Sequence, residues 1–196
     1  MDKREYPRGP LQVILLAGLR ASGKSLCGRA LKHLLLDLGH CDYLDLDEVE
    51  EKTPRKFELF YKRCLQTMSA KGGIWILDKL GPYGDEARMR LLKEIRTTAE
   101  VSILLQFVHS VELEELRMCY FRSCRRGNNH RDVASSVEDV FNNINFEQAQ
   151  RRGLTDSEVA CLTYIKDVQM KATPFDMVFE AINHLHSVSF INKKTE

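Results

Sequence analysis

Apolar residues gather in five short runs along the chain, and longer segments of mixed polarity separate them. A short apolar run bounded by polar residues is typical of a buried strand. We therefore expect five strands, at residues 11–16, 41–46, 73–77, 101–108 and 175–181. Strands that alternate with helices predict an α/β fold, with a mostly parallel sheet covered by helices on both faces.

Helical spacing of apolar residues predicts helices in the segments between these strands. Apolar residues recur every three or four positions over 27–38, which is the spacing of one helix face. Thr53 and Pro54 suit an N-cap and a first helical position, and apolar residues at helical spacing follow as far as Met68. Similar signals predict later helices at 112–126, at 156–170 and after Ser135 or Ser136.

The segment after the first apolar run fits the P-loop pattern G-x-x-x-x-G-K-[ST], between a predicted strand and a predicted helix. Gly18 and Gly23 let backbone amides turn toward a polyphosphate, and the positive end of the helix attracts the same anion. Lys24 would reach the β and γ phosphates, and the Ser25 hydroxyl would bind Mg²⁺. The predicted nucleotide-binding residues are Gly18, Ala21, Ser22, Gly23, Lys24, Ser25 and Leu26. The alternative is a glycine-bearing turn with an accidental Lys-Ser pair.

Length and composition fit one globular domain. The chain has 196 residues, of which 43% are hydrophobic and 29% charged. We expect one domain over 11–190, between a flexible leader at 1–10 and a tail at 191–196. The net charge of +1 gives no general basic field for a nucleic-acid backbone, so any such contact would be local.

The six cysteines show no C-x-x-C spacing, which argues against a zinc site or a disulfide framework. No apolar run approaches the length of a membrane span, and the first ten residues lack the apolar stretch of a secretory signal. We expect a cytoplasmic or nuclear protein with reduced thiols and no membrane partner.

Carboxylates follow the second and third predicted strands. Asp45 and Asp47 share one face of the second strand by alternation, and Asp78 ends the third. Ligands of doubly wound folds bind at the carboxyl ends of strands. We expect Asp47 to accept the proton of an attacking hydroxyl, and Asp45 and Asp78 to orient Mg²⁺. The alternative is that these carboxylates cap the next segments or only face solvent.

A cluster of arginines precedes a Gly-Asn-Asn-His segment. Three of them lie at i, i+3 and i+4, so a helix would present one cationic edge. Guanidinium groups can neutralise charge on transferring phosphoryl oxygens, which favours a lid with Arg122 and Arg126 in catalytic roles. The predicted lid spans about 117–136 and includes Arg122, Arg125, Arg126, Asn129 and His130. The alternative is a solvated charged face, with the histidine orienting only the backbone.

With these residues, the chain resembles the polynucleotide 5′-kinase domain of fungal-type tRNA ligases, over about 11–182. The resemblance rests on the P-loop, on the segment 46–49 before the Pro54 helix, on the Arg-Gly-Asn-Asn-His segment at 126–130 and on the segment 175–178. Arg131 departs from the family pattern, where Gln tends to stand, and so does the segment 79–81 after the third strand.

The resemblance implies a P-loop kinase fold and a kinase that uses Mg²⁺ with ATP or GTP to phosphorylate an RNA 5′-hydroxyl. It implies that Asp47 is the general base, that Lys24 and Ser25 contact the phosphates and Mg²⁺, and that Arg126 is a lid arginine. It is also compatible with one domain of a multidomain RNA ligase. Two alternatives stay open: a small-molecule kinase resembling nucleoside monophosphate or dephospho-coenzyme A kinases, and a non-catalytic nucleotide-binding module.

Overall fold

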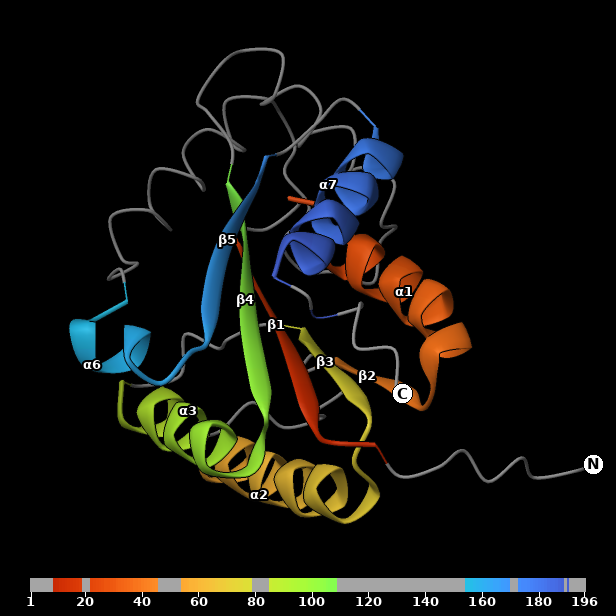
Figure 1. Ribbon diagram of the computed structural model, residues 1–196. Helices are drawn as coiled ribbons and strands as arrows, with labels where there is room; N and C mark the ends of the chain where they lie inside the picture. The colour runs from red at the N-terminus through yellow and green to blue at the C-terminus, as the bar shows by residue number, and fades with distance from the viewer. Residues whose placement is uncertain are drawn as a thin grey trace, which may run out of the picture.

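The computed structural model describes residues 9–18, 22–45, 54–78, 85–108, 154–169, 173–188 and 190. In this part of the chain, a single twisted sheet lies between two layers of helices (Figure 1). The predicted α/β fold class is confirmed.

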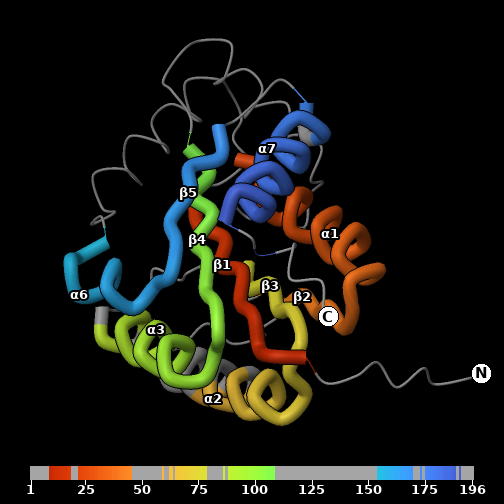
Figure 2. The backbone as a smooth tube through the Cα atoms, in the orientation of Figure 1, coloured from red at the N-terminus to blue at the C-terminus, as the bar shows by residue number. Residues whose placement is uncertain are grey.

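Among the described residues, five strands form the sheet, in the order β2-β3-β1-β4-β5. They are β1 (Gln12–Gly18), β2 (Cys41–Asp45), β3 (Ile74–Asp78), β4 (Val101–Val108) and β5 (Tyr164–Gln169). Every neighbouring pair is parallel, so all carboxyl ends meet at one edge of the sheet. We call this the carboxyl edge; the arrows of Figure 1 point toward it, and Figure 2 shows the strands lying side by side.

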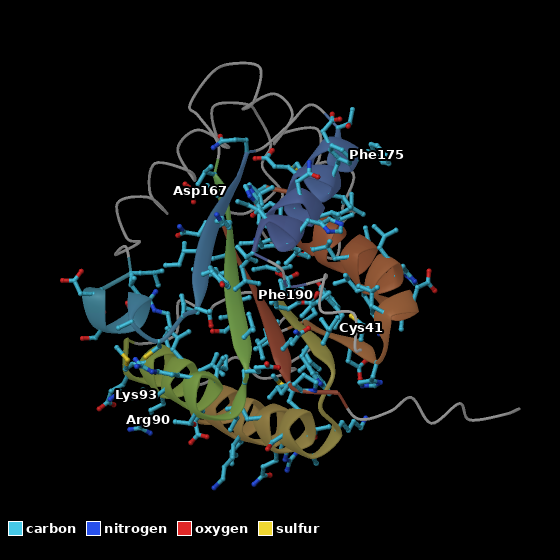
Figure 3. All side chains as sticks on the ribbon, viewed as in Figure 1. Cys41, Arg90, Lys93, Asp167, Phe175 and Phe190 are labelled. Carbon is cyan, nitrogen blue, oxygen red and sulfur yellow. The ribbon has the colours of Figure 1, made fainter. Side chains whose placement is uncertain are left out.

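Helices cover both faces of the sheet. They are α1 (Lys24–Leu35) with the short 3₁₀ helix η1 (Leu36–Leu38), α2 (Pro54–Lys71), α3 (Asp85–Thr98), α6 (Asp156–Val159) and α7 (Pro174–Ser187). The helices α1 and α7 cover one face, and α2 and α3 cover the other (Figure 1). Arg90 and Lys93 extend from α3 away from the sheet (Figure 3). No helix in the described ranges is long and apolar enough to cross a bilayer.

The central strand β1 supplies apolar side chains to two separate cores. Ile14 and Leu16 pack with residues of α1 and α7, such as Leu31 and Leu185. The side chains between them along the strand, such as Leu15, point to the other face and pack against α2 and α3. A strand that is buried on both faces is apolar at nearly every position. This is why the apolar pattern predicted β1 correctly.

The prediction of the fifth strand was wrong. Residues 175–181 lie within α7, while β5 occupies Tyr164–Gln169, inside the segment where a helix was predicted. Only the first turn of that segment is helical, as α6. In α7 the buried residues Met177, Val178, Ala181 and Leu185 follow a helical period, and Thr173 caps its N-terminus by accepting a hydrogen bond from the Asp176 amide. In β5, Val168 alone is buried, because in the described part of the sheet this strand lies at the edge, beside β4.

The first four predicted strands agree with β1 to β4 within two residues, and the helices predicted over 27–38 and from Pro54 correspond to α1 and α2. The helices predicted at 112–126 and after Ser135 or Ser136, the predicted lid, the tail and most of the leader lie outside the described residues.

Candidate functional site

The P-loop pattern occupies the junction between β1 and α1, at the carboxyl edge. Gly23 is the N-cap of α1, with φ 87° and ψ 0°, a left-handed conformation that glycine adopts without a Cβ penalty. No side chain caps this N-terminus in the described structure, and the first turn of α1 carries no acidic residue. The leading backbone amides and the helix dipole are therefore suited to binding an anion.

Gly18 allows the start of the loop to approach β4 closely. A Cβ at this position would lie 2.8 Å from Phe107 Cβ and 3.1 Å from Ser22 Oγ. Because φ is 156° here, another residue would also be strained. The first glycine of the pattern is thus required by packing as well as by backbone conformation.

The side chains of the loop and of the first turn of α1 differ in exposure. Ser22 and Lys24 are buried, Ser25 is half-buried, and the Leu26 side chain is exposed. The Ser22 hydroxyl has no hydrogen-bond partner among the described residues, which is rare for a buried polar atom. A phosphate oxygen bound by the loop is a chemically suitable partner for this hydroxyl.

Two carboxylates lie at the carboxyl edge beside the loop. The strand register pairs Asp45 of β2 with Asp78 of β3, and pairs Asp78 with Leu16 of β1, two residues before Gly18. Both aspartates are buried, Asp78 completely. Burying two ionised carboxylates on neighbouring strands is costly unless each is paired or meets a cation.

Tyr43 of β2 is the hydrogen-bond partner of Asp78. Its hydroxyl donates to Asp78 Oδ2 over 2.5 Å. The other carboxylate oxygen, Oδ1, is buried and has no hydrogen-bond partner among the described residues. Burial, followed by the contact with Asp78, raises the pKa of Tyr43 well above its ordinary value of 10.0, so the hydroxyl stays protonated.

Arg29 of α1 is an ion-pair partner of Asp45. Its Nη2 lies 3.5 Å from Asp45 Oδ2, and its guanidinium carbon lies 6.0 Å from the centre of the Tyr43 ring. The guanidinium is largely exposed, whereas Asp45 is buried. Arg29 therefore links α1 to the carboxylate side of the site.

Cys27, in the first turn of α1, is buried in the same region. Burial and then the negative charge of Asp78 raise its pKa to about 12. The thiolate is the nucleophilic and metal-binding form of cysteine. Cys27 is therefore an unreactive packing residue at neutral pH.

The donor atoms at the carboxyl edge fit Mg²⁺. The described part of the chain contains no group of three or more His, Cys, Asp or Glu side chains that could hold a metal by themselves. Magnesium in phosphate-binding sites is usually held by one or two carboxylates together with substrate phosphates. Asp78 Oδ1 and the Ser25 hydroxyl suit this mixed donor set, in which bound phosphates would supply the other oxygens.

The structure brings most of the described candidate residues to one edge of the sheet. These are Gly18, Ser22, Gly23, Lys24, Ser25, Asp45 and Asp78. Seven other candidates lie outside the described residues: Ala21, Asp47, Arg122, Arg125, Arg126, Asn129 and His130.

Sequence reasoning missed Tyr43, Arg29 and Gly28. Alternation along β2 places Tyr43 on the face of Asp45, so the strand pattern held a signal for it. The roles of Arg29 and Gly28 depend on how α1 packs against β2, which the sequence pattern does not specify.

No family model and no curated protein matches the sequence. Solved structures do match. Shikimate kinase from Acinetobacter baumannii, in complex with shikimate, has a TM-score of 0.53 at 16% identity, over 94% of this chain and 96% of that one.

Two further solved structures are similar. A protein named APE1195 has a TM-score of 0.56 at 17% identity, over 95% of this chain and 98% of that one. Kti12 from Chaetomium thermophilum, in complex with ADP-AlF3, has a TM-score of 0.55 at 16% identity, over 88% of this chain and 97% of that one. At this identity the likeness concerns the fold: the chain has a P-loop kinase-like α/β fold with the strand order 2-3-1-4-5.

Proposed function

We propose that the protein is a P-loop phosphotransferase that moves the γ-phosphate of ATP or GTP to the 5′-hydroxyl of an RNA end. The observation that carries the phosphotransfer part is the pairing of Asp45 with Asp78 beside the glycine-built N-terminus of α1. Anion-binding amides and carboxylates for a cation thus meet at the carboxyl edge, where ligands of such sheets bind.

Each candidate residue has a proposed role in this reaction. The loop amides and Lys24 bind the triphosphate, while Ser25 and Asp78 hold Mg²⁺, with Asp45 beside them. Bound Mg²⁺ would neutralise charge on the β and γ phosphates. Asp47 accepts the proton of the attacking hydroxyl, and Arg122 and Arg126 neutralise the transferring phosphoryl group, within a lid that also contains Arg125, Asn129 and His130.

The RNA acceptor is supported by the sequence resemblance, through the segment around Asp47 and the Arg-Gly-Asn-Asn-His segment at 126–130. A small-molecule acceptor is the second candidate. The observation in its favour is the likeness to a shikimate kinase, whose solved structure holds shikimate, over 94% of this chain. The Kti12 structure, which holds ADP-AlF3, supports nucleotide binding but does not distinguish the two acceptors.

A transfer assay separates these candidates. The protein is incubated with Mg²⁺ and γ-labelled ATP or GTP, together with a 5′-hydroxyl RNA oligonucleotide, the same RNA carrying a 5′-phosphate, or a panel of small acceptors. The panel contains nucleoside monophosphates, dephospho-coenzyme A and shikimate. We expect label on the 5′-hydroxyl RNA and none on its 5′-phosphorylated control. Label on a small acceptor alone would overturn the RNA assignment, and nucleotide binding without any transfer would favour a non-catalytic module.

The variant Asp47→Ala tests the proposed general base in the same assay. General acid–base catalysis contributes roughly 10²–10⁴-fold to rate, so transfer should fall by about 100-fold or more while nucleotide affinity stays nearly unchanged. The matched control is Asp42→Ala in β2, whose carboxylate lies 3.3 Å from Lys32 Nζ on the partly exposed surface. Equal activity in the two variants would contradict the role of Asp47.

A further inference from the structure

Tyr43 contacts both α1 and a carboxylate of the candidate site. It lies on β2 two residues before Asp45, and its hydroxyl reaches across to β3, where it donates to Asp78 Oδ2 over 2.5 Å. Asp78 is fully buried, and its second oxygen has no hydrogen-bond partner among the described residues. The tyrosine thus engages one carboxylate oxygen and leaves the other for a ligand.

The Tyr43 ring is held from the side of α1. A Cβ on Gly28 would lie 2.7 Å from Tyr43 Cε2, so the helix backbone approaches the ring as closely as a glycine allows. The Arg29 guanidinium carbon lies 6.0 Å from the ring centre, and the same guanidinium pairs with Asp45. The close approach of Gly28 limits how far the ring can turn toward α1, and the ring carries the hydroxyl that donates to Asp78.

We propose that Tyr43 is a positioning residue, which orients the Asp78 carboxylate so that Oδ1 faces the magnesium ion of a bound nucleotide. The inference rests on the Mg²⁺–nucleotide binding of the proposed function, but not on the identity of the acceptor. A carboxylate can turn about its last side-chain torsion, which is broad. A hydrogen bond to one oxygen removes this freedom and keeps the other oxygen available as a metal donor.

Groups that orient metal ligands in this way typically contribute 10–100-fold to metal affinity. The test is therefore a binding measurement that does not depend on catalysis. The affinity of the full chain for ADP is measured by titration calorimetry without metal and over a series of Mg²⁺ concentrations. For Tyr43→Phe, we expect the Mg²⁺-dependent gain in affinity to fall by about 10-fold or more, while the metal-free affinity for ADP is unchanged.

The matched control is Tyr164→Phe, which removes a hydroxyl at the start of β5, at the opposite end of the sheet. This variant should bind Mg²⁺ and ADP as the wild type does. Tyr43→Phe keeps the ring volume, and thermal unfolding verifies that it folds. A lower melting temperature with an unchanged Mg²⁺ dependence would overturn the proposal, because a purely structural role predicts that result.

A double-mutant cycle with Asp78→Asn tests whether Tyr43 acts through Asp78. Asp78→Asn alone should lose the Mg²⁺-dependent gain in affinity, and adding Tyr43→Phe should then change little further. An Asp78→Asn variant that keeps the full Mg²⁺-dependent gain in affinity would overturn the proposal, even if Tyr43→Phe failed to fold. Additive effects of the two substitutions on this gain would also overturn it. Failure of the RNA transfer assay with an intact Mg²⁺ effect would count against the proposed acceptor alone.

Discussion

At position 28, the absence of a Cβ lets α1 approach two strands at once. A Cβ there would lie 2.6 Å from Leu16 Cδ1 and 2.7 Å from Tyr43 Cε2. Leu16 is fully buried, and Tyr43 is tied to Asp78 by its hydroxyl, so neither side chain can move away without cost. Gly28 therefore connects the packing of α1 to the arrangement of the carboxylates.

Gly28→Ala should destabilise the fold despite its better helix propensity. The exchange gains up to about 1 kcal/mol in propensity, but overpacking costs about 1–3 kcal/mol. We expect a net loss of about 1 kcal/mol in the free energy of unfolding, measured by urea denaturation, and a weaker Mg²⁺ effect on ADP affinity. The matched control is Gly9→Ala, where a Cβ would meet no atom within 4 Å. A Gly28→Ala protein as stable as wild type would contradict the packing argument.

Among the elements, α6 is short but firmly anchored. Thr155 and Glu158 form a capping box at its N-terminus. The Glu158 carboxylate is fully buried and accepts two hydrogen bonds from Arg88 of α3, at 2.6 Å and 3.1 Å. This ion pair fixes α6 against α3. Since β5 follows α6 along the chain, the ion pair also helps to position this edge strand.

The same carboxylate makes stability depend on pH. Burial alone would raise the pKa of Glu158, but its hydrogen bonds with Arg88 and Thr155 outweigh burial and hold the pKa below the ordinary 4.5. A lowered folded-state pKa adds stability that is fully present above the unfolded-state pKa and lost as the pH falls through the folded-state value.

Glu158→Gln should therefore lower the free energy of unfolding at pH 7, by about 3 kcal/mol if it costs as much as other broken buried ion pairs. The difference in the free energy of unfolding between this variant and the wild type should shrink as the pH falls below about 4.5. Urea denaturation at several pH values would measure it. The control is Glu86→Gln, whose exposed carboxylate forms an i,i+4 pair with Arg90 and should matter little. A loss that is constant with pH would contradict the assignment.

At the scale of the whole molecule, both cores depend on the central strand. Ile14 and Leu16 belong to the core under α1 and α7, and Val13 and Leu15 to the core under α2 and α3. The P-loop pattern begins at the last residue of this strand. Binding at the loop should therefore be coupled to the stability of the entire sheet.

A bound nucleotide should consequently stabilise the whole fold. At about 100 times its dissociation constant, a ligand specific for the native state adds about 2.7 kcal/mol to the free energy of unfolding. We expect Mg²⁺ with ADP to raise the melting temperature of the wild type and of Lys32→Ala, but much less that of Lys24→Ala. Lys32 is a fair control because it lies on the same helix and pairs with Asp42 at the surface. An equal rise in both variants would count against Lys24 as a phosphate-binding residue.

The sequence by itself determined the features that depend on local chemistry and on the spacing of apolar residues along the chain. Strands buried on both faces are largely apolar, so β1, β3 and β4 were recognisable. The glycines of the loop and Lys24, between a strand and a helix, predict a phosphate-binding junction. The predicted roles of Asp47 and the lid arginines stay predictions.

Only the tertiary structure decided the features that depend on a neighbour. The edge strand β5 has a mixed pattern, and its backbone is extended because β4 offers hydrogen-bonding partners along one side. The residues at 175–181 are apolar enough for a strand, yet they form a helix whose one face packs on the sheet. The Tyr43–Asp78 hydrogen bond likewise exists because the parallel register of β2 and β3 brings these side chains together, and register is a property of paired strands rather than of either sequence alone.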